Sequence, residues 1–181
     1  MAKAKSVVLG VTGSIAAYKA CEVIRLLKKE SCEVTVLLTP EGEKFITPLT
    51  LQTLSSNKVV TGMFEVPEDW DPAHVALADK ADLVLIAPAT AHIIGKIASG
   101  LCDDIVSCVV CATKAPVLIA PAMNANMYMN KAVQENITKL KRAGYKFAGP
   151  VRGMLACGYE GIGCLAAPSD IVKEAKRLLK R

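Results

Sequence analysis

Short apolar runs recur along this chain of 181 residues, and segments whose apolar residues have helical spacing separate them. Several runs are rich in β-branched side chains, which is typical of strands buried on both faces of a parallel sheet. The predicted strands cover residues 6–11, 33–38, 82–87, 116–120 and 146–148. Because strands that alternate with helices form parallel sheets, we predict an α/β fold with one doubly wound sheet, Rossmann-like or flavodoxin-like. Helices should cover both faces, giving three α/β/α layers.

The helices between these strands are predicted from apolar spacing and end signals. Residues 14–29 end in the basic pair Lys28-Lys29, which suits a helix C-terminus. Further helical stretches are predicted near 90–112 and 130–142. The last helix should be capped by Ser169-Asp170 and run to the basic end of the chain.

Two segments rich in Gly and Pro are expected to stay irregular. Residues 61–73 should form a surface excursion that leads to His74, and residues 149–168 should form a mobile flap. A hairpin without chemistry is the alternative for the second segment. No linker or repeat divides the chain, so residues 1–181 are predicted to be one domain.

The composition favours a homo-oligomer. The chain is 52% hydrophobic and 22% charged, with a mean hydropathy of +0.34, which is unusually apolar for a small monomer. No run is long enough and uncharged enough to cross a bilayer, so a membrane partner is not expected. The surplus apolar surface should instead be buried between subunits.

Charge and cysteine content narrow the partners and the compartment. The net charge of +5 is modest, and three Phe, four Tyr and one Trp offer little for base stacking, so we expect no nucleic-acid partner. The first apolar run is interrupted by Gly10, Gly13 and Lys19, which does not fit a signal peptide. The seven cysteines are therefore expected to be reduced thiols of a cytoplasmic protein. His74 and His92 are too isolated to predict a metal site.

The first junction between strand and helix is a candidate phosphate site. In Gly-Val-Thr-Gly-Ser-Ile-Ala at 10–16, glycine lets backbone N–H groups approach a ligand, and Ser14 adds a hydroxyl. The dinucleotide spacing Gly-x-Gly-x-x-Gly is absent, and the second strand ends in Thr39-Pro40 without an acidic residue for a ribose. These features favour a mononucleotide. Glycines that serve packing alone are the alternative.

The end of the fourth predicted strand carries Pro-Ala-Met-Asn-Ala-Asn-Met-Tyr at 121–128. Met123 and Met127 around the amide of Asn124 indicate an apolar pocket wall with one orienting polar group. Alternatively, Asn124 is a turn residue and the methionines fill the core. Ala-Pro-Ala-Thr at 87–90 ends the third strand in a similar way, and its small residues would admit a flat aromatic ligand.

Two groups of cysteines differ in their surroundings. Cys108-Val-Val-Cys111 lies in an apolar helical stretch, which favours core packing. Cys157 lies in the Gly-rich flap, where a thiol could reach a pocket, and Cys164 in the same flap is the alternative thiol.

Taken in order, these motifs resemble the flavin-containing cysteine decarboxylases, in particular the phosphopantothenoylcysteine decarboxylases of coenzyme A biosynthesis. The resemblance rests on the motifs at 10–16, 87–91, 121–124 and 156–158 and on His74 before Leu77-Ala78. It implies FMN as the cofactor. The residues implied to hold its phosphate, ribityl chain and ring are Gly13, Ser14, Ile15, Thr39, Phe45, Thr90 and Ser107.

The resemblance also implies a reaction. The substrate is (R)-4′-phospho-N-pantothenoyl-L-cysteine, and the products are 4′-phosphopantetheine and carbon dioxide. Oxidation of the cysteine thiol to a thioaldehyde supplies the electron sink that decarboxylation needs, and the resulting ene-thiolate is then reduced.

Each implied catalytic residue has its own part. Asn124 would orient the carboxylate, His74 would assist thiol oxidation across a subunit interface, and Cys157 would donate a proton in the last step. Met123, Met127 and Ala156 would contact substrate together with Asn124 and Cys157. The implied assembly is a trimer or a larger assembly of trimers.

The chain departs from the family pattern at several places. Tyr128 stands where Trp is usual, His92 where Asn is usual, and Cys164-Leu165 where Arg-Met is typical. The rival relatives are lantibiotic peptidyl-cysteine decarboxylases, flavin prenyltransferases and non-catalytic regulators of protein phosphatases. Pro-Ala-Met-Asn argues against prenyltransferases, Cys157 against peptidyl-cysteine decarboxylases, and the retained His74, Asn124 and Cys157 against regulators. Whether the domain stands alone or is fused to a synthetase is left open.

Overall fold

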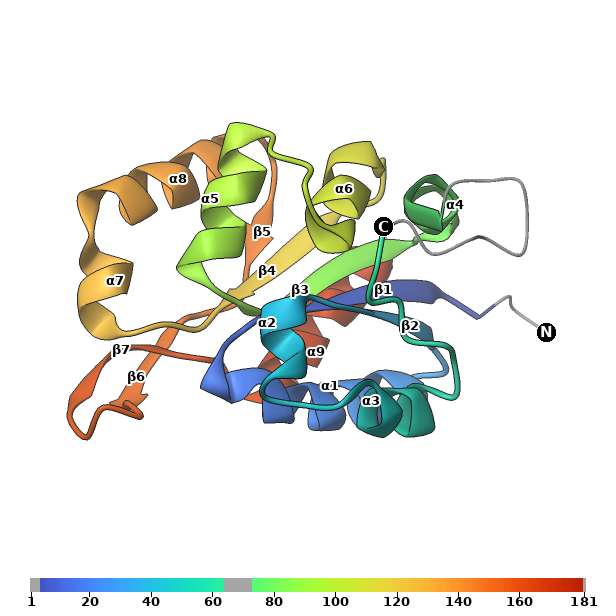
Figure 1. The fold of residues 1–181 in the computed structure, drawn as a ribbon, viewed down its shortest axis with the longest axis horizontal. Coiled ribbons are helices and arrows are strands. Elements are labelled where there is room, and N and C mark those ends of the chain that lie inside the picture. The colour runs from blue at the N-terminus through green and yellow to red at the C-terminus, as the bar shows by residue number, and fades with distance from the viewer. Residues whose placement is uncertain (1–3, 64–72, 181) are drawn as a thin grey trace.

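The centre of the molecule is a parallel sheet whose strands follow the order β2-β1-β3-β4-β5. Figure 1 shows the arrangement in the computed structural model, which describes residues 4–63 and 73–180. The strands are β1 (Ser6–Val11), β2 (Glu33–Leu38), β3 (Leu83–Ala89), β4 (Val117–Pro121) and β5 (Lys146–Phe147). All neighbouring pairs are parallel. This is the doubly wound, flavodoxin-like order, so the predicted fold class is confirmed.

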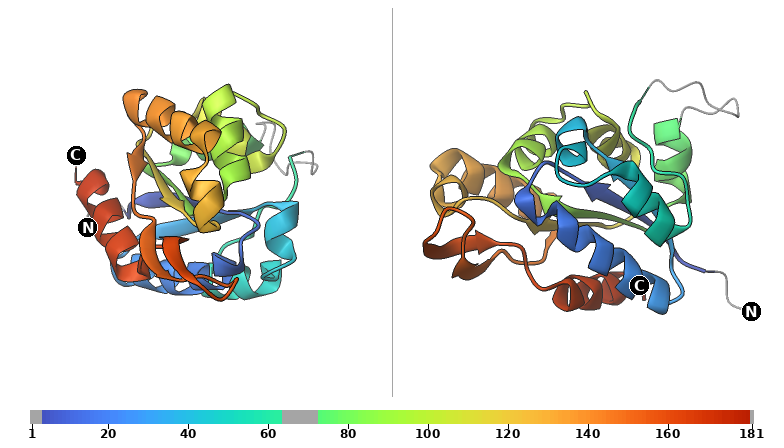
Figure 2. Two further views of the ribbon diagram at one scale, coloured as in Figure 1. Left: turned by 90° about the vertical axis from the view of Figure 1, so that its left-hand side faces the viewer. Right: turned by 60° about the horizontal axis from the view of Figure 1, so that its bottom comes forward.

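Helices cover both faces of this sheet, as the side views in Figure 2 show. One face carries η1 (Ile15–Lys19), α1 (Ala20–Lys29), α3 (Pro48–Ser55) and α9 (Pro168–Leu179). The other face carries α4 (Ala73–Lys80), α5 (Ala91–Ser99), α6 (Ile105–Ala112) and α8 (Lys131–Arg142). The short helices α2 (Pro40–Glu43) and α7 (Ala125–Met129) follow the ends of β2 and β4.

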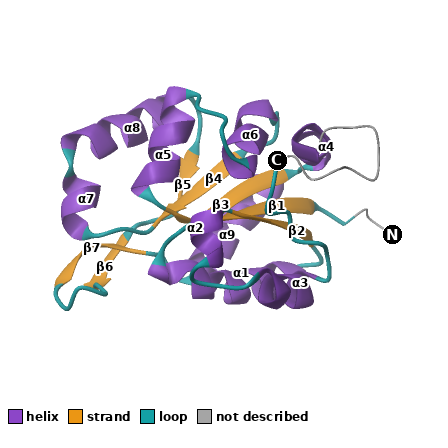
Figure 3. Cartoon of the chain, in the orientation of Figure 1, coloured by secondary structure: helices purple, strands orange, loops and turns teal. Residues whose placement is uncertain are grey.

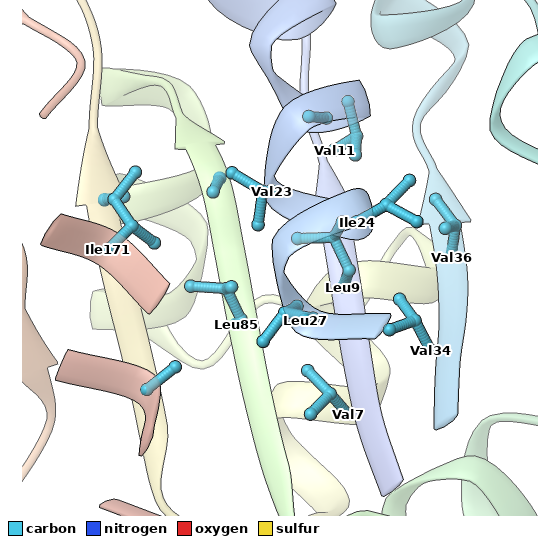
Figure 4. Close-up of a cluster of buried hydrophobic side chains, with 14 of the residues drawn as sticks. Val7, Leu9, Val11, Val23, Ile24, Leu27, Val34, Val36, Leu85 and Ile171 are labelled. Atoms are coloured by element: carbon cyan, nitrogen blue, oxygen red, sulfur yellow. The ribbon is translucent and has the colours of Figure 1, made fainter. Parts of the chain in front are cut away.

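The core divides between the two faces because successive side chains of a strand point to opposite sides. In β1, Val7 and Leu9 pack with Ile24 and Leu27 of α1, whereas Val8 belongs to the cluster on the other face. Figure 4 shows the first of these clusters. Burial of each such aliphatic side chain contributes about 1.5–3 kcal/mol. The central strands are buried on both faces and form a rigid base for the loops at their carboxyl ends.

Two local predictions were wrong. The helical prediction near 90–112 is confirmed, and the region forms two helices because Gly100 ends α5 in the left-handed conformation with φ 70°. The last helix begins at Pro168 with Ala167 as its N-cap, so Ser169 and Asp170 lie inside the first turn. Proline at the first helical position explains this start, since it has no N–H to satisfy.

The second wrong prediction is the irregular structure of residues 149–168, where the hairpin given as the alternative is present. Residues 149–168 contain an antiparallel hairpin, β6 (Val151–Met154) with β7 (Glu160–Cys164). Figure 3 shows this hairpin beside α7, apart from the main sheet. The other expected irregular segment, 61–73, lies largely outside the described residues. Among the described helices, none is long and apolar enough to span a membrane.

Candidate active site

A cavity of about 490 Å³ lies at the carboxyl edge of the sheet. The turn after β1, the start of α5, the end of β4 with α7, and the hairpin contribute its walls. The strand order reverses between β1 and β3, and such switch points are where open α/β sheets bind ligands. The predicted site residues in its lining are Gly13, Ser14, Ile15, Thr90, Met123, Asn124, Met127, Ala156 and Cys157.

The turn after β1 is held by packing and by a cap. Ser14 is the N-cap of η1, and its Oγ accepts a hydrogen bond from the backbone N–H of Ala16 at 3.3 Å. A Cβ at Gly13 would collide with Glu41 of α2, so only glycine allows this close approach. Gly13 is therefore required for packing, which was the alternative interpretation, and it also lines the cavity.

Thr12 ties the ends of β1 and β3 together, and the sequence analysis did not single it out. Its buried Oγ1 donates to the carbonyl of Pro88 at 2.8 Å and accepts from the backbone N–H of Thr90 at 3.2 Å. Thr90 in turn caps α5 by accepting from the N–H of Ile93. The signal available in the sequence was a polar residue at the end of an apolar strand.

Asn124 is both a cap and a cavity residue. Its Oδ1 accepts from the backbone N–H of Asn126 at 2.8 Å, which fixes the start of α7. Its Nδ2 lies 3.4 Å from Sγ of Cys157 and donates to the hydroxyl of Tyr159 at 2.8 Å. The turn role and the pocket position were predicted as alternatives, but Asn124 combines them. Its oxygen caps the turn, and its nitrogen lies at the cavity. The sequence analysis missed Tyr159.

The hairpin is attached directly to the end of β4. The backbone N–H of Met123 donates to the carbonyl of Gly163 at 3.0 Å. Gly163 has a φ of 147°, and a Cβ there would collide with the carbonyl oxygen of Met123. Glycine at this position allows the hairpin to lie against the loop that carries Asn124.

Three residues predicted to hold a cofactor do not line this cavity. Thr39 caps α2, and its backbone N–H bonds to the carbonyl of Val11 at the end of β1. Phe45 follows α2 and has 47% of its surface exposed. Ser107 is buried in a capping box with Asp104 at the start of α6.

His74 lies far from Asn124 and Cys157. It belongs to α4, which Figures 1 and 2 place at the opposite end of the molecule from α7 and the hairpin. Among the described residues, Nδ1 of His74 is buried without a hydrogen-bond partner. One chain therefore brings together the predicted residues Asn124 and Cys157 but not the third predicted catalytic residue.

The other cysteines have distinct settings. Cys164 lines the same cavity, but its Sγ donates to the carbonyl of Met154 at 3.3 Å. Cys108 is buried, as predicted, and burial raises its pKa, whereas Cys111 is exposed. Two causes raise the pKa of Cys102 to about 11: desolvation is the larger, and the interaction with Cys111 is the next. Within residues 4–63 and 73–180, no cluster of three or more His, Cys, Asp or Glu could hold a metal ion.

The chemistry of the lining fits a planar cofactor that carries a phosphate. Ser14 and Thr90 present hydroxyls and helix starts, while Met123, Met127 and Leu165 form apolar wall. Lys19 also lines the cavity and adds a positive charge. Backbone N–H groups at helix starts favour an anion, and small or apolar side chains suit an aromatic ring system.

Comparison with known proteins gives consistent results. The sequence profile of the family described as Flavoprotein matches residues 1–180. The chain is 44% identical over 173 residues to the coenzyme A biosynthesis bifunctional protein CoaBC of Bacillus subtilis, covering 96% of this chain and 43% of that protein. It is 42% identical over 177 residues to a probable phosphopantothenoylcysteine decarboxylase of Streptococcus mutans, covering 97% of this chain and 99% of that protein. The chain thus spans less than half the length of the bifunctional relatives.

Solved structures agree. A cysteine-to-serine mutant of PPC decarboxylase, complexed with pantothenoylaminoethenethiol, superposes with a TM-score of 0.87 at 29% identity, covering 99% of this chain and 100% of that one. The FMN-binding protein AtHal3 superposes with a TM-score of 0.82 at 30% identity, covering 97% of this chain and 96% of that one. The resemblance expected from the motifs is confirmed, and the chain belongs to the Flavoprotein family over residues 1–180.

Proposed function

We propose that this chain is an FMN-dependent decarboxylase that converts (R)-4′-phospho-N-pantothenoyl-L-cysteine to 4′-phosphopantetheine. The observation that carries the proposal is the amide of Asn124, which lies 3.4 Å from the thiol of Cys157 at one apolar cavity. The similarity to the probable phosphopantothenoylcysteine decarboxylase, over nearly the full length of both chains, supports the same substrate.

FMN would be held at the carboxyl edge of the sheet. Gly13, Ser14, Ile15 and Thr90 line the cavity there, and Thr39 lies beside them at the end of β1. Phe45 and Ser107 belong to the set that the resemblance implies, but they lie outside the cavity of this chain. FMN dependence of similar cysteine decarboxylases supports this assignment. When bound, FMN supplies the two-electron oxidation and reduction that thiol and ene-thiolate require.

Asn124 orients the carboxylate of the substrate in this proposal. A carboxylate that leaves water for an apolar site needs hydrogen-bond donors, because its desolvation is otherwise costly. Met123 and Met127 provide the apolar wall, and Asn124 provides a neutral donor from Nδ2. A neutral donor binds the carboxylate while leaving the loss of carbon dioxide possible, whereas a strongly paired cation would hold the charge in place.

Cys157 donates the proton in the last step. It is exposed toward the cavity, and its Sγ is within hydrogen-bond distance of Asn124. A thiol is a stronger acid than a hydroxyl, so a cysteine suits protonation of the ene-thiolate during its reduction. This proton separates the proposed reaction from that of peptidyl-cysteine decarboxylases, which stop at the oxidised ene-thiol.

A trimer would complete the site. His74 lies at the opposite end of the chain from the cavity, so a ring of subunits joined head to tail could place it beside the Asn124 of a neighbour. Ile15, Tyr18 and Met154 line the cavity and are exposed, which suits burial against another subunit. The free cysteines and the pathway suit the reducing cytoplasm.

The test is to incubate the purified protein with phosphopantothenoylcysteine and to identify the product by mass. We expect a yellow protein that releases FMN on denaturation, and a product lighter than the substrate by one carbon dioxide. An ene-thiol with two hydrogens fewer would assign the chain to the peptidyl-cysteine type of chemistry. A protein that binds FMN but leaves the substrate intact would reject the proposed function.

A further inference from the structure

Both polar atoms of the Asn124 side chain have hydrogen-bond partners. Oδ1 accepts from the N–H of Asn126 at 2.8 Å. Nδ2 carries two N–H donors, and its partners are the hydroxyl of Tyr159 at 2.8 Å and Sγ of Cys157 at 3.4 Å. A substrate carboxylate can therefore reach Asn124 only by displacing one of these two acceptors.

The two acceptors differ in strength. A neutral thiol sulfur is a weak acceptor even at 3.4 Å, an ordinary distance for sulfur, whereas a phenol oxygen at 2.8 Å is a good acceptor. The bond to Cys157 is therefore the one that yields. The N–H released in this way points toward the thiol and the cavity, while the other N–H stays bound to Tyr159.

We propose that Tyr159 is a positioning residue, which holds the amide of Asn124 so that one N–H is presented to the substrate carboxylate. Tyr159 is not among the residues that line the cavity, so it acts through Asn124 rather than on the substrate. The proposal rests on the proposed function for the identity of the ligand, but the hydrogen bond itself does not depend on it.

The cap at the start of α7 excludes the flipped amide. The N–H of Asn126 requires an oxygen at its side of the amide, because a flipped side chain would place two donors face to face. Tyr159 then binds the nitrogen at the other side. Without Tyr159, the side chain would keep only the cap and the weak contact with Cys157, and Nδ2 would lose its strong partner.

The hairpin keeps the Tyr159 ring in place. The N–H of Leu155 donates to the carbonyl of Tyr159 at 2.9 Å, which closes the turn before β7. The ring lies beside Gly161, where a Cβ would approach Cε2 of Tyr159 to 3.7 Å and the side chain of Ala125 more closely. Tyr159 thereby links the hairpin to α7 at the catalytic amide.

The first experiment compares ligands with and without a carboxylate on the FMN-loaded variant Tyr159→Phe, which keeps the ring. We expect kcat/KM for phosphopantothenoylcysteine to fall about 10-fold, the typical effect of losing one hydrogen bond. Inhibition by 4′-phosphopantetheine, which lacks the carboxylate, should be unchanged. A displaced hairpin would weaken both ligands alike, and that result, or an unchanged kcat/KM, would overturn the proposal. Tyr145→Phe, which removes a hydroxyl elsewhere, is the control and should behave as the unmodified protein.

A second measurement needs no turnover. In asparagine-labelled protein, the side-chain amide signal of Asn124 is assigned by its loss in Asn124→Asp. We expect its protons to exchange with water about 10-fold faster in Tyr159→Phe than in the unmodified protein. Equal exchange rates would overturn the positioning role. If the unmodified protein fails to decarboxylate the substrate, the proposed function fails, and this measurement alone decides the role of Tyr159.

Discussion

The two ends of this molecule carry different parts of one predicted site. At one end, the cavity brings Asn124, Cys157 and Tyr159 into contact through the hairpin and α7. At the other end, α4 holds His74 with a buried Nδ1 that has no partner among the described residues. The sheet between them is buried on both faces and keeps the two ends of one chain apart.

If His74 acts in the proposed reaction, a single chain is an incomplete catalyst. Parallel strands place their carboxyl ends at one edge, so loops at that edge meet easily. A residue at the far end can join them only from another copy of the chain.

The strongest test mixes two inactive variants. His74→Gln and Asn124→Asp should each reduce turnover at least about 100-fold, because in the proposed reaction each removes a group that contacts the substrate. If the sites lie between subunits, co-assembly of the two variants should restore roughly a quarter of the unmodified activity, since that share of interfaces pairs two intact residues. The measurement is carbon dioxide release after co-expression and joint purification.

The control for this test is a mixture of His74→Gln with a second His74 variant, which should remain inactive. FMN content should stay near that of the unmodified protein in Asn124→Asp, because Asn124 belongs to the substrate side. Failure of every mixed assembly to regain activity would place His74 outside the site of its neighbour and would contradict the divided site.

Within the cavity end, Cys157→Ser should stall the reaction at a defined point. Oxidation and decarboxylation should proceed, so substrate should bleach the yellow colour and release carbon dioxide. A serine hydroxyl is a far weaker acid than a thiol, so the reductive protonation should slow at least about 100-fold. Mass spectrometry should detect a product with two hydrogens fewer than 4′-phosphopantetheine.

Cys164→Ser is the matched control, because Cys164 lines the same cavity on the same hairpin. Its Sγ donates to the carbonyl of Met154, and a serine hydroxyl can make the same bond. We therefore expect turnover within about 3-fold of the unmodified protein. A stall in Cys164→Ser with normal turnover in Cys157→Ser would assign the proton to the other thiol.

The cavity end was largely predictable from the sequence because it depends on strand ends. The apolar runs located β1 and β2 to the residue, and the topology of a parallel sheet then requires Gly13, Thr90 and Asn124 to share one edge. Local patterns suffice when the fold itself brings the loops together.

Other features were not predictable, because they depend on contacts between segments distant in the chain. The sequence indicated a hairpin only as an alternative, because the short strands β6 and β7 mix glycines with exposed and half-buried residues and lack a regular apolar pattern. Their pairing and the contact of the hairpin with Met123 emerge only in three dimensions. Tyr159 is a partner of Asn124 only because of that docking. The position of His74 relative to the cavity likewise follows from the whole fold.

The smallest expected effect concerns the segment between the two ends. Helix α6 carries Ser107 and packs against both α4 and α5. Lys96 of α5 binds Asp104, the N-cap of α6, at 2.7 Å and Asp103 at 2.8 Å. The side chains of Lys96 and Asp104 are only 13% and 14% exposed, so removing the cation leaves a nearly buried carboxylate without a counter-charge.

Lys96→Met should lower the free energy of unfolding at pH 7 by about 2 kcal/mol, less than for a fully buried pair because solvent reaches Asp103. The hydrogen bond to Lys96 lowers the pKa of Asp103. The stabilisation from the charged Asp103 carboxylate is therefore present above its pKa in the unfolded chain, about 4, and is lost at lower pH. Desolvation acts to lower the pKa of Lys96, but the hydrogen bonds to Asp103 and Asp104 outweigh desolvation, and the pKa is raised. The stabilisation from the charged Lys96 is therefore present below about pH 10 and is lost at higher pH. The difference between variant and unmodified protein, measured by urea unfolding, should therefore be largest between these limits.

Lys80→Met is the control, because it breaks a pair with Glu33 whose side chains are 59% and 40% exposed. It should change the free energy of unfolding by less than about 0.5 kcal/mol. Equal effects of the two substitutions would show that the start of α6 does not depend on Lys96, and the segment joining the two ends would then be held by apolar packing alone.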